Sequence, residues 1–165
     1  MKPITLAVGV TLTAAVSLLQ GCTSAYQGTY ETQMRRLENQ ERLNQAQEEA
    51  AHAEAQKYAA VIYFAVGSAD IDSDGQRELR WFVQKMQPYP QAIIDVQGFA
   101  DVTGGATENQ VLSNQRAANV AGFLNSQGIA TSRIVTQGFG EEYPAAPNES
   151  AKGRRNNRRV EVTIR

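Results

Sequence analysis

Residues 92–117 read AIIDVQGFADVTGGATENQVLSNQRA, and this stretch decides the fold. It opens with Ala92 to Gly98, a run rich in apolar and β-branched residues that predicts a strand. The glycine pair at 104–105 lets the chain turn back. Helix-forming residues follow, and we expect a helix over about 113–126, with Gly128 as its stop. A strand, a loop and a helix in this order form the unit from which α/β folds are built.

The segment before this unit carries similar signals. Val61 to Val66 is a short apolar run that ends at Gly67, which predicts a buried strand. Asp72 to Gly75 supplies residues that start helices. The apolar spacing i, i+3, i+4 and i+7 from Leu79 to Met86 then predicts an amphipathic helix.

Two further strands complete the predicted domain. Arg133 to Gly138 forms the third strand, and the alternation of apolar and polar residues over 160–164 predicts the last one. The order is βαβαββ over residues 60–165. We therefore expect an α/β (α+β) sandwich in which helices pack on one face of a mixed sheet.

The composition excludes several classes of protein. The chain has 16 basic and 17 acidic residues, which argues against a nucleic-acid partner. It has one cysteine, Cys22, and one histidine, His52, so a disulfide, a cysteine-rich metal site or a histidine-based catalytic arrangement is not expected. Asp70, Asp72 and Asp74 lie close together but are typical of a turn and a helix start. We expect no catalysis, no cofactor and no metal.

Residues 1–21 resemble a secretory signal peptide. Lys2 is followed by an uncharged, largely apolar run over residues 4–19. This run has about 16 residues, fewer than the roughly 20 that cross a bilayer as a helix.

Leu19-Gln20-Gly21-Cys22 resembles the lipobox of bacterial lipoproteins, in which the cysteine is acylated and becomes the first residue of the mature chain. Acyl chains anchor a protein stably when more than one is present. The alternative is an ordinary buried thiol. Thr23 stands where an inner-membrane retention signal tends to have Asp, so the resemblance favours the outer membrane, with the domain facing the periplasm.

Residues 22–59 form the expected lipidated N-terminus and linker. Gln, Glu, Ala and Arg dominate the composition, and these residues favour helices. No apolar heptad persists long enough for a coiled coil. We expect a partly helical, solvated stalk.

Four residues of the central unit suggest a binding site: Asp101, Asn109, Leu112 and Arg116. A carboxylate can take an ammonium group, and a guanidinium can grip a carboxylate through two parallel hydrogen bonds. The site would then suit a zwitterion. The alternative is that Asp101 caps a turn and pairs with Arg116 on the surface, which would stabilise the protein by only about 0–1 kcal/mol.

From Val61 to Arg165 the sequence resembles the C-terminal domain family of OmpA, which includes the peptidoglycan-associated lipoproteins. The resemblance rests on a series of short motifs in unbroken order: Tyr63-Phe64, Gly98-Phe99-Ala100-Asp101-Val102-Thr103-Gly104, Asn109, Leu112-Ser113-Asn114-Gln115-Arg116-Ala117, Gly128-Ile129, Gly138-Phe139-Gly140-Glu141 and Asn157-Arg158-Arg159-Val160.

The resemblance implies a peptidoglycan site. The family's Asp and Arg at the positions of Asp101 and Arg116 clasp meso-diaminopimelate of the stem peptide, and the residues at Asn109 and Leu112 line the pocket. The loop with Gly67 and Ser68 is the remaining part of the expected site. Gly67 departs from the Asp or Asn that relatives often have, so backbone groups would replace a side-chain contact there. Phe99 and Ala100 also depart from the usual His and Thr.

Two functions follow from the resemblance. In the first, the chain is an outer-membrane lipoprotein that tethers the membrane to the wall by binding peptidoglycan. In the second, it is a wall-binding lipoprotein of a regulatory, motor or secretion assembly, and its main role is to act on an envelope protein partner. Its partners are then peptidoglycan and, through Cys22, the lipid bilayer.

A basic run precedes the last predicted strand: Lys152, Arg154, Arg155, Arg158 and Arg159. A patch for an anionic polymer is one interpretation, and a solvated loop that leads into an edge of the sheet is the other. Strand parity places Arg158 near the pocket and Arg159 away from it.

Overall fold

The computed structural model describes residues 9–165, with side chains from residue 28 onward. Residues 1–8 of the expected signal peptide, and the side chain of Cys22, lie outside this described part. The chain divides into two compact units, with the boundary between Glu48 and Glu49.

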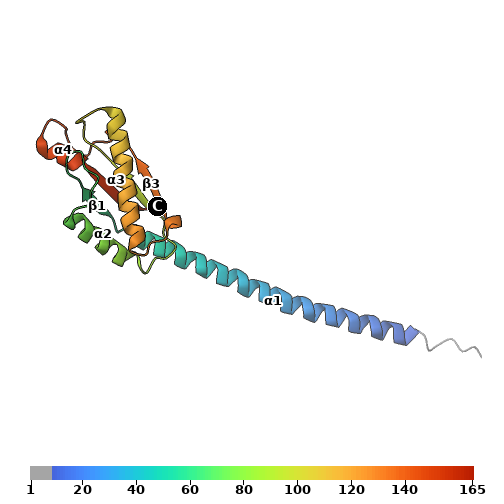
Figure 1. Ribbon diagram of the computed structural model, residues 1–165. Helices are drawn as coiled ribbons and strands as arrows, with labels where there is room; N and C mark the ends of the chain where they lie inside the picture. The colour runs from blue at the N-terminus through green and yellow to red at the C-terminus, as the bar shows by residue number, and fades with distance from the viewer. Residues whose placement is uncertain (1–8) are drawn as a thin grey trace, which may run out of the picture. The chain divides into compact units, whose positions relative to one another are not determined.

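The N-terminal unit is built from the helix α1 (Gly9–Ala55), which is unbroken where a partly helical stalk was expected (Figure 1). All side chains from residue 28 to residue 48 are exposed. None of the helices within residues 9–165 combines the length and the apolar character that a membrane crossing requires.

The second unit contains the predicted domain. It starts at Glu49, before the expected boundary at residue 60, because the end of α1 and the following turn pack on the core through Ala55 and Tyr58. Its elements follow one another as β1 (Ala60–Tyr63), α2 (Ser73–Met86), β2 (Ile94–Gly98), α3 (Ala106–Ser126), a short 3-10 turn (Thr131–Arg133), β3 (Ile134–Gly138), α4 (Ala151–Asn157) and β4 (Arg159–Ile164).

The four strands form a mixed sheet in the order β1-β4-β2-β3. β2 and β3 are parallel, and β4 runs antiparallel to both β1 and β2. The predicted fold class is confirmed. The expectation that the basic run leads into a sheet edge is wrong, because β4 lies in the interior of the sheet and β1 takes the edge.

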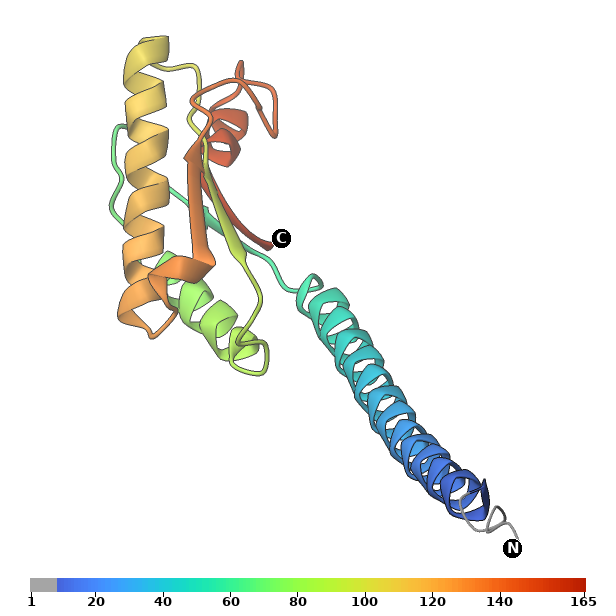
Figure 2. The same ribbon diagram turned by 90° about the vertical axis from the view of Figure 1, so that its right-hand side faces the viewer.

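The core lies between the sheet and the helices α2 and α3, which cover the same face (Figure 2). Alternate residues of β2 and β4 point into this core and are fully buried, as are the apolar positions of the two helices: Ile94, Val96, Val160, Val162, Leu79, Phe82, Met86, Val120 and Leu124. The other face of the sheet is not covered by these helices. The first strand is therefore not wholly buried as predicted, since Val61 and Tyr63 are 39% and 45% exposed.

Two helix predictions are corrected by the structure. α3 begins at Ala106 rather than near 113, so the loop after β2 is shorter than expected. The expected solvated loop before the last strand contains α4, whose N-cap Ser150 accepts a hydrogen bond from the Gly153 amide. α4 has no apolar periodicity to reveal it, and its packing depends on Gly153, where a Cβ would lie 1.8 Å from the Pro147 carbonyl oxygen.

The contact between β2 and α3 requires glycine at position 98. A Cβ there would lie 2.1 Å from the carbonyl oxygen of Ser113. We expect Gly98→Ala to lower the free energy of unfolding by about 1–3 kcal/mol or more, because the backbone of α3 must move. Urea unfolding followed by circular dichroism measures the change.

The matched control is Gly122→Ala on the same helix, where a Cβ meets nothing within 4 Å. This substitution should raise the free energy of unfolding by about 0.5–1 kcal/mol through helix propensity. Equal effects of the two substitutions would contradict the close approach of α3 to β2.

Candidate functional site

A pocket of about 190 Å³ lies where the loops after β1 and β2 meet α3. It contains five of the six residues that the sequence indicated for the ligand site. Ser68 is the exception. The lining consists of Val66, Gly67, Ala100, Asp101, Thr103, Gly104, Asn109, Leu112, Arg116 and Arg158. Among residues 28–165, no group of three or more His, Cys, Asp or Glu side chains is gathered that could hold a metal ion.

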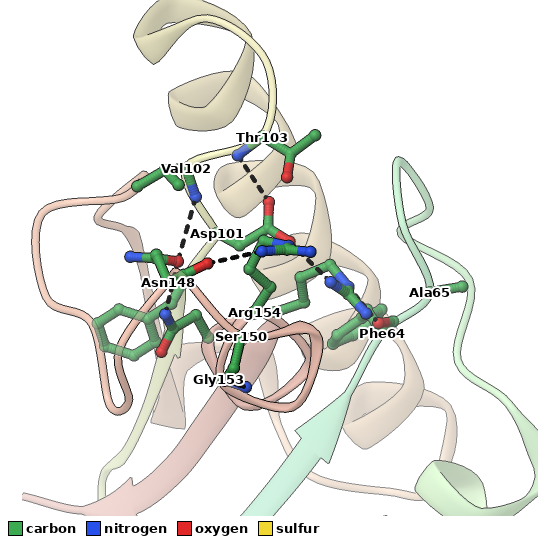
Figure 3. A network of polar contacts seen from close by, with 12 residues as sticks. Phe64, Ala65, Asp101, Val102, Thr103, Asn148, Ser150, Gly153 and Arg154 are labelled. Carbon is green, nitrogen blue, oxygen red and sulfur yellow. Dashed lines mark hydrogen bonds and ion pairs between the residues drawn. The ribbon is translucent and has the colours of Figure 1, made fainter.

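Asp101 is buried, and both of its carboxylate oxygens accept hydrogen bonds. Oδ1 accepts from the Thr103 amide at 2.9 Å, and Oδ2 accepts from Arg158 Nη1 at 2.7 Å. Figure 3 shows the turn that Asp101 and Thr103 close. Burial alone would raise the pKa of the Asp101 carboxyl, but the hydrogen bonds from Arg158 and Thr103 outweigh it and hold the pKa below its ordinary value. The pocket therefore contains a charged carboxylate at neutral pH.

Arg116 is fully buried, and it does not pair with Asp101. Nε donates to the Ser68 carbonyl at 2.9 Å, Nη1 to the Phe99 carbonyl at 2.9 Å, and Nη2 to the Ala65 carbonyl at 3.2 Å. The alternative of a surface pair between Asp101 and Arg116 is thus wrong. Asp101 does cap a turn, as that alternative held, but its ionic partner is Arg158.

The charge of Arg116 is poorly compensated. Burial and, to a smaller extent, the charge of Arg158 lower the pKa of its guanidinium, Asp101 opposes them, and together they bring this pKa to about 10. The group remains protonated at neutral pH, yet among residues 28–165 it has no carboxylate in ion-pair contact. Since each terminal nitrogen carries two N–H groups and uses one for a carbonyl, Arg116 keeps N–H donors for a ligand.

The loop after β1 wraps its backbone around Arg116. Gly67 has φ +66°, a conformation that suits glycine, and lines the pocket without a side chain. Ser68 contributes its carbonyl to Arg116, while its hydroxyl donates to the Asp70 carboxylate at 3.1 Å. The loop thus offers backbone groups to the site, as the departure at Gly67 suggested.

α3 supplies Asn109 and Leu112 in addition to Arg116. Because α3 starts at Ala106, Asn109 lies in its first turn, and Arg116 lies in the third turn rather than near the first as expected. Asn109 is buried, and its Nδ2 donates to Glu141 Oε2 at 2.6 Å. The positive end of the helix dipole lies beside Gly104, at the pocket lining.

Arg158 is the main residue of the pocket that lay outside the expected ligand set. It is the C-cap of α4, and its Nε donates to the Phe64 carbonyl at 3.0 Å while Nη1 donates to Asp101. Its predicted position near the pocket is confirmed. Arg159 does not line the pocket; it lies 3.9 Å from the centre of the Phe99 ring and pairs with Glu161.

Comparison with known proteins agrees with this architecture. The model of the OmpA family matches residues 63–158, which is more than half of the chain and includes every pocket residue. The chain belongs to the OmpA family.

Relatives within the OmpA family include lipoproteins and wall anchors. The chain is 41% identical over 103 residues to the probable lipoprotein YiaD of Escherichia coli K12, covering 62% of this chain and 47% of that protein, so it matches about half of that relative's length. The peptidoglycan-associated lipoprotein of Burkholderia pseudomallei has a similar structure, with a TM-score of 0.62, 25% identity and coverage of 64% of this chain and 90% of that chain. The cell wall anchor of the T6SS of Pseudomonas aeruginosa gives a TM-score of 0.57 at 31% identity, over 64% of this chain and 79% of that one.

The pair of Asp101 and Arg158 predicts a specific pH dependence of stability. We expect Asp101→Asn to lower the free energy of unfolding at about pH 7 by about 1–3 kcal/mol, because Arg158 loses its charged partner beside the cationic Arg116. The pKa of Asp101 is lower in the folded protein, so its contribution is present above the unfolded value of about 3.9. That contribution is lost as the pH falls through the folded value.

Urea unfolding of both proteins between about pH 2 and about pH 7 tests this linkage. The wild type and Asp101→Asn should converge in acid. Asp74→Asn is the control, since Asp74 forms an exposed pair with Arg77 that contributes at most about 1 kcal/mol. A difference between wild type and Asp101→Asn that stayed constant over this range would contradict the assigned pKa direction.

Proposed function

We propose that this chain is an outer-membrane lipoprotein whose second unit binds peptidoglycan non-covalently through the meso-diaminopimelate of the stem peptide. Acylated Cys22 would hold one end in the membrane, and the pocket would hold the wall. The protein would then tether the two layers without catalysis.

The observation that carries this proposal is that the buried Arg116 has no carboxylate in ion-pair contact, although it lies in the same pocket as a charged Asp101. A buried cation without an ionic partner favours an anion in contact with it. The free end of diaminopimelate is a zwitterion, so its carboxylate would take the free N–H groups of Arg116 and its ammonium would take Asp101. Lysine at the same place in a wall peptide offers the ammonium alone and leaves Arg116 unpaired.

The relatives support wall binding as the class of function. One similar structure is titled a peptidoglycan-associated lipoprotein, and another is titled a cell wall anchor. A curated relative is named a probable lipoprotein, which supports the membrane anchor at Cys22. α1 would then separate the anchor from the domain: the segment from Cys22 to Ala55 corresponds to about 50 Å as a helix.

A second candidate is a wall-binding lipoprotein that serves a protein assembly. An aromatic cluster favours it: Tyr58 lies 6.3 Å from both Trp81 and Tyr89 between ring centres, and Lys85 lies 5.9 Å from the Tyr58 and Trp81 rings. Trp81 is 40% exposed, and such side chains are enriched in protein interfaces. Co-purification of a stoichiometric protein that is lost on Trp81→Ala would favour this candidate.

Sedimentation with purified cell walls tests the proposed function. The chain from Ser24 onward retains the whole of the compact unit Glu49–Arg165, and we expect it to sediment with walls that contain meso-diaminopimelate and not with walls that contain lysine. Asp101→Asn should cost about 2–5 kcal/mol in binding, because it removes one partner of a charged hydrogen bond. Asp74→Asn, which changes a surface carboxylate outside the pocket, is the matched control.

Arg116→Lys completes the series. It keeps the charge but cannot serve three carbonyls and a carboxylate in one plane, so binding should fall while the protein stays folded by circular dichroism. Equal retention on the two wall types, or wild-type retention of Asp101→Asn, would refute the pocket assignment.

A further inference from the structure

The helix α4 and its C-cap residue carry a row of basic residues that ends at the pocket. Lys152, Arg155 and Arg158 are spaced three residues apart, and side chains with this spacing are neighbours on a helix surface. Arg158, at the end of the row, binds Asp101 inside the pocket. Lys152 and Arg155 are exposed, so the row runs from the pocket lining to the solvent.

The two exposed members of this row have no ionic partner among residues 28–165, where the ion pairs of the described side chains involve other groups. Residues 144–158 contain four cations and a single carboxylate, that of Glu149. Of the remaining cations, Arg154 is engaged, since its Nη1 donates to the carbonyls of Asn148 and Glu149. Lys152 and Arg155 therefore give the exposed surface of α4 that precedes Arg158 a net positive charge.

The position of α4 relative to the pocket is fixed by polar contacts. Asn157 is fully buried; its Oδ1 accepts from the Ala146 amide, and its Nδ2 donates to the Ala146 carbonyl and to Asn148 Oδ1. Asn148 Oδ1 also accepts from the Val102 amide at 3.5 Å, in the loop that carries Asp101 (Figure 3). The loop of the pocket and the loop before α4 are thereby joined, so the basic row is held at a set distance from the ligand site.

From these contacts we infer that Lys152 and Arg155 bind a second carboxylate on the same peptide whose diamino-acid end enters the pocket. The inference rests on the proposed function. Lys152 lies six positions before the C-cap Arg158, which corresponds to about 9 Å at the rise of a helix. An extended peptide covers about 3.3–3.6 Å per residue, so the second carboxylate lies one to three residues from the diamino acid. A stem peptide has such a group, the free α-carboxylate of its γ-linked glutamate.

Calorimetric titration of the full chain in a non-ionic detergent tests the inference. The two ligands are free meso-diaminopimelate and a tripeptide, L-Ala-γ-D-Glu-meso-diaminopimelate, which adds the second carboxylate. We expect Lys152→Ala/Arg155→Ala to weaken tripeptide binding by about three- to tenfold, the size typical of two solvent-exposed charge contacts. Binding of free diaminopimelate should stay within about twofold of the wild type, because the pocket itself is intact.

Three comparisons sharpen the result. Lys152→Arg/Arg155→Lys should bind the tripeptide as the wild type does, and Arg35→Ala/Arg36→Ala, which removes two exposed cations from α1, should leave both ligands unaffected. At about 1 M salt, where the screening length is about 3 Å, the difference between wild type and the Lys152→Ala/Arg155→Ala variant should disappear.

Unchanged tripeptide binding by the Lys152→Ala/Arg155→Ala variant would overturn the inference while leaving the pocket intact. Equal weakening of both ligands would also overturn it, since the row would then act on the pocket and not on a second carboxylate. Failure of the wild type to bind either ligand would refute the proposed function, and this inference with it.

Discussion

The buried guanidinium of Arg116 is the interaction on which the site depends. It comes from the middle of α3 and donates to three backbone carbonyls, two in the loop after β1 and one at the end of β2. The Phe99 carbonyl is buried, and without Arg116 it would lose this partner in the interior, which would destabilise the protein. One side chain thus fixes two loops that lie far apart in the sequence, and the pocket is the space between them and the helix.

The same interaction sets the electrostatics of the pocket. Arg116 uses neutral carbonyls as acceptors, so its charge stays without a counterion, while Asp101 is paired with Arg158. Two guanidinium groups and one carboxylate leave the site positive, and burial makes each charge act more strongly than it would in water. A ligand that brings a carboxylate gains most from such a site. The exposed cations Lys152 and Arg155 on α4 add further positive charge in the segment that ends at Arg158.

The sequence predicted the fold where periodicity carries the information. Leu79 to Met86 has the spacing of an amphipathic helix, and the residues from 160 to 164 alternate as a strand does, because burial of one face requires these patterns. α4 could not be predicted in this way, since its seven residues include no apolar side chain larger than that of Ala151 and are held by loop contacts through Asn157 and Gly153. Nor does local sequence show that β4 inserts between β1 and β2, which is a long-range pairing.

The sequence predicted which residues form the site better than it predicted the contacts between them. Asp101, Asn109, Leu112 and Arg116 do line one pocket. Their pairing was not predictable, because the partner of Asp101 comes from a residue 57 positions away and the partners of Arg116 are backbone carbonyls. Every residue has a backbone carbonyl, so the sequence does not show which carbonyls accept hydrogen bonds from an arginine. An Asp and an Arg near one helix therefore suggest an ion pair with each other even where none forms.

The pocket assignment is tested most directly by locating the residues that the ligand contacts. Nuclear magnetic resonance of the chain from Ser24 onward, titrated with meso-diaminopimelate, would follow the Nε–H of Arg116 and the backbone amides of residues 99–104. We predict that saturating shifts concentrate on these signals and on Arg158, and that lysine leaves the Arg116 signal unmoved. Shifts confined to the aromatic cluster around Trp81, or an unchanged Arg116 signal at saturation, would contradict the pocket assignment.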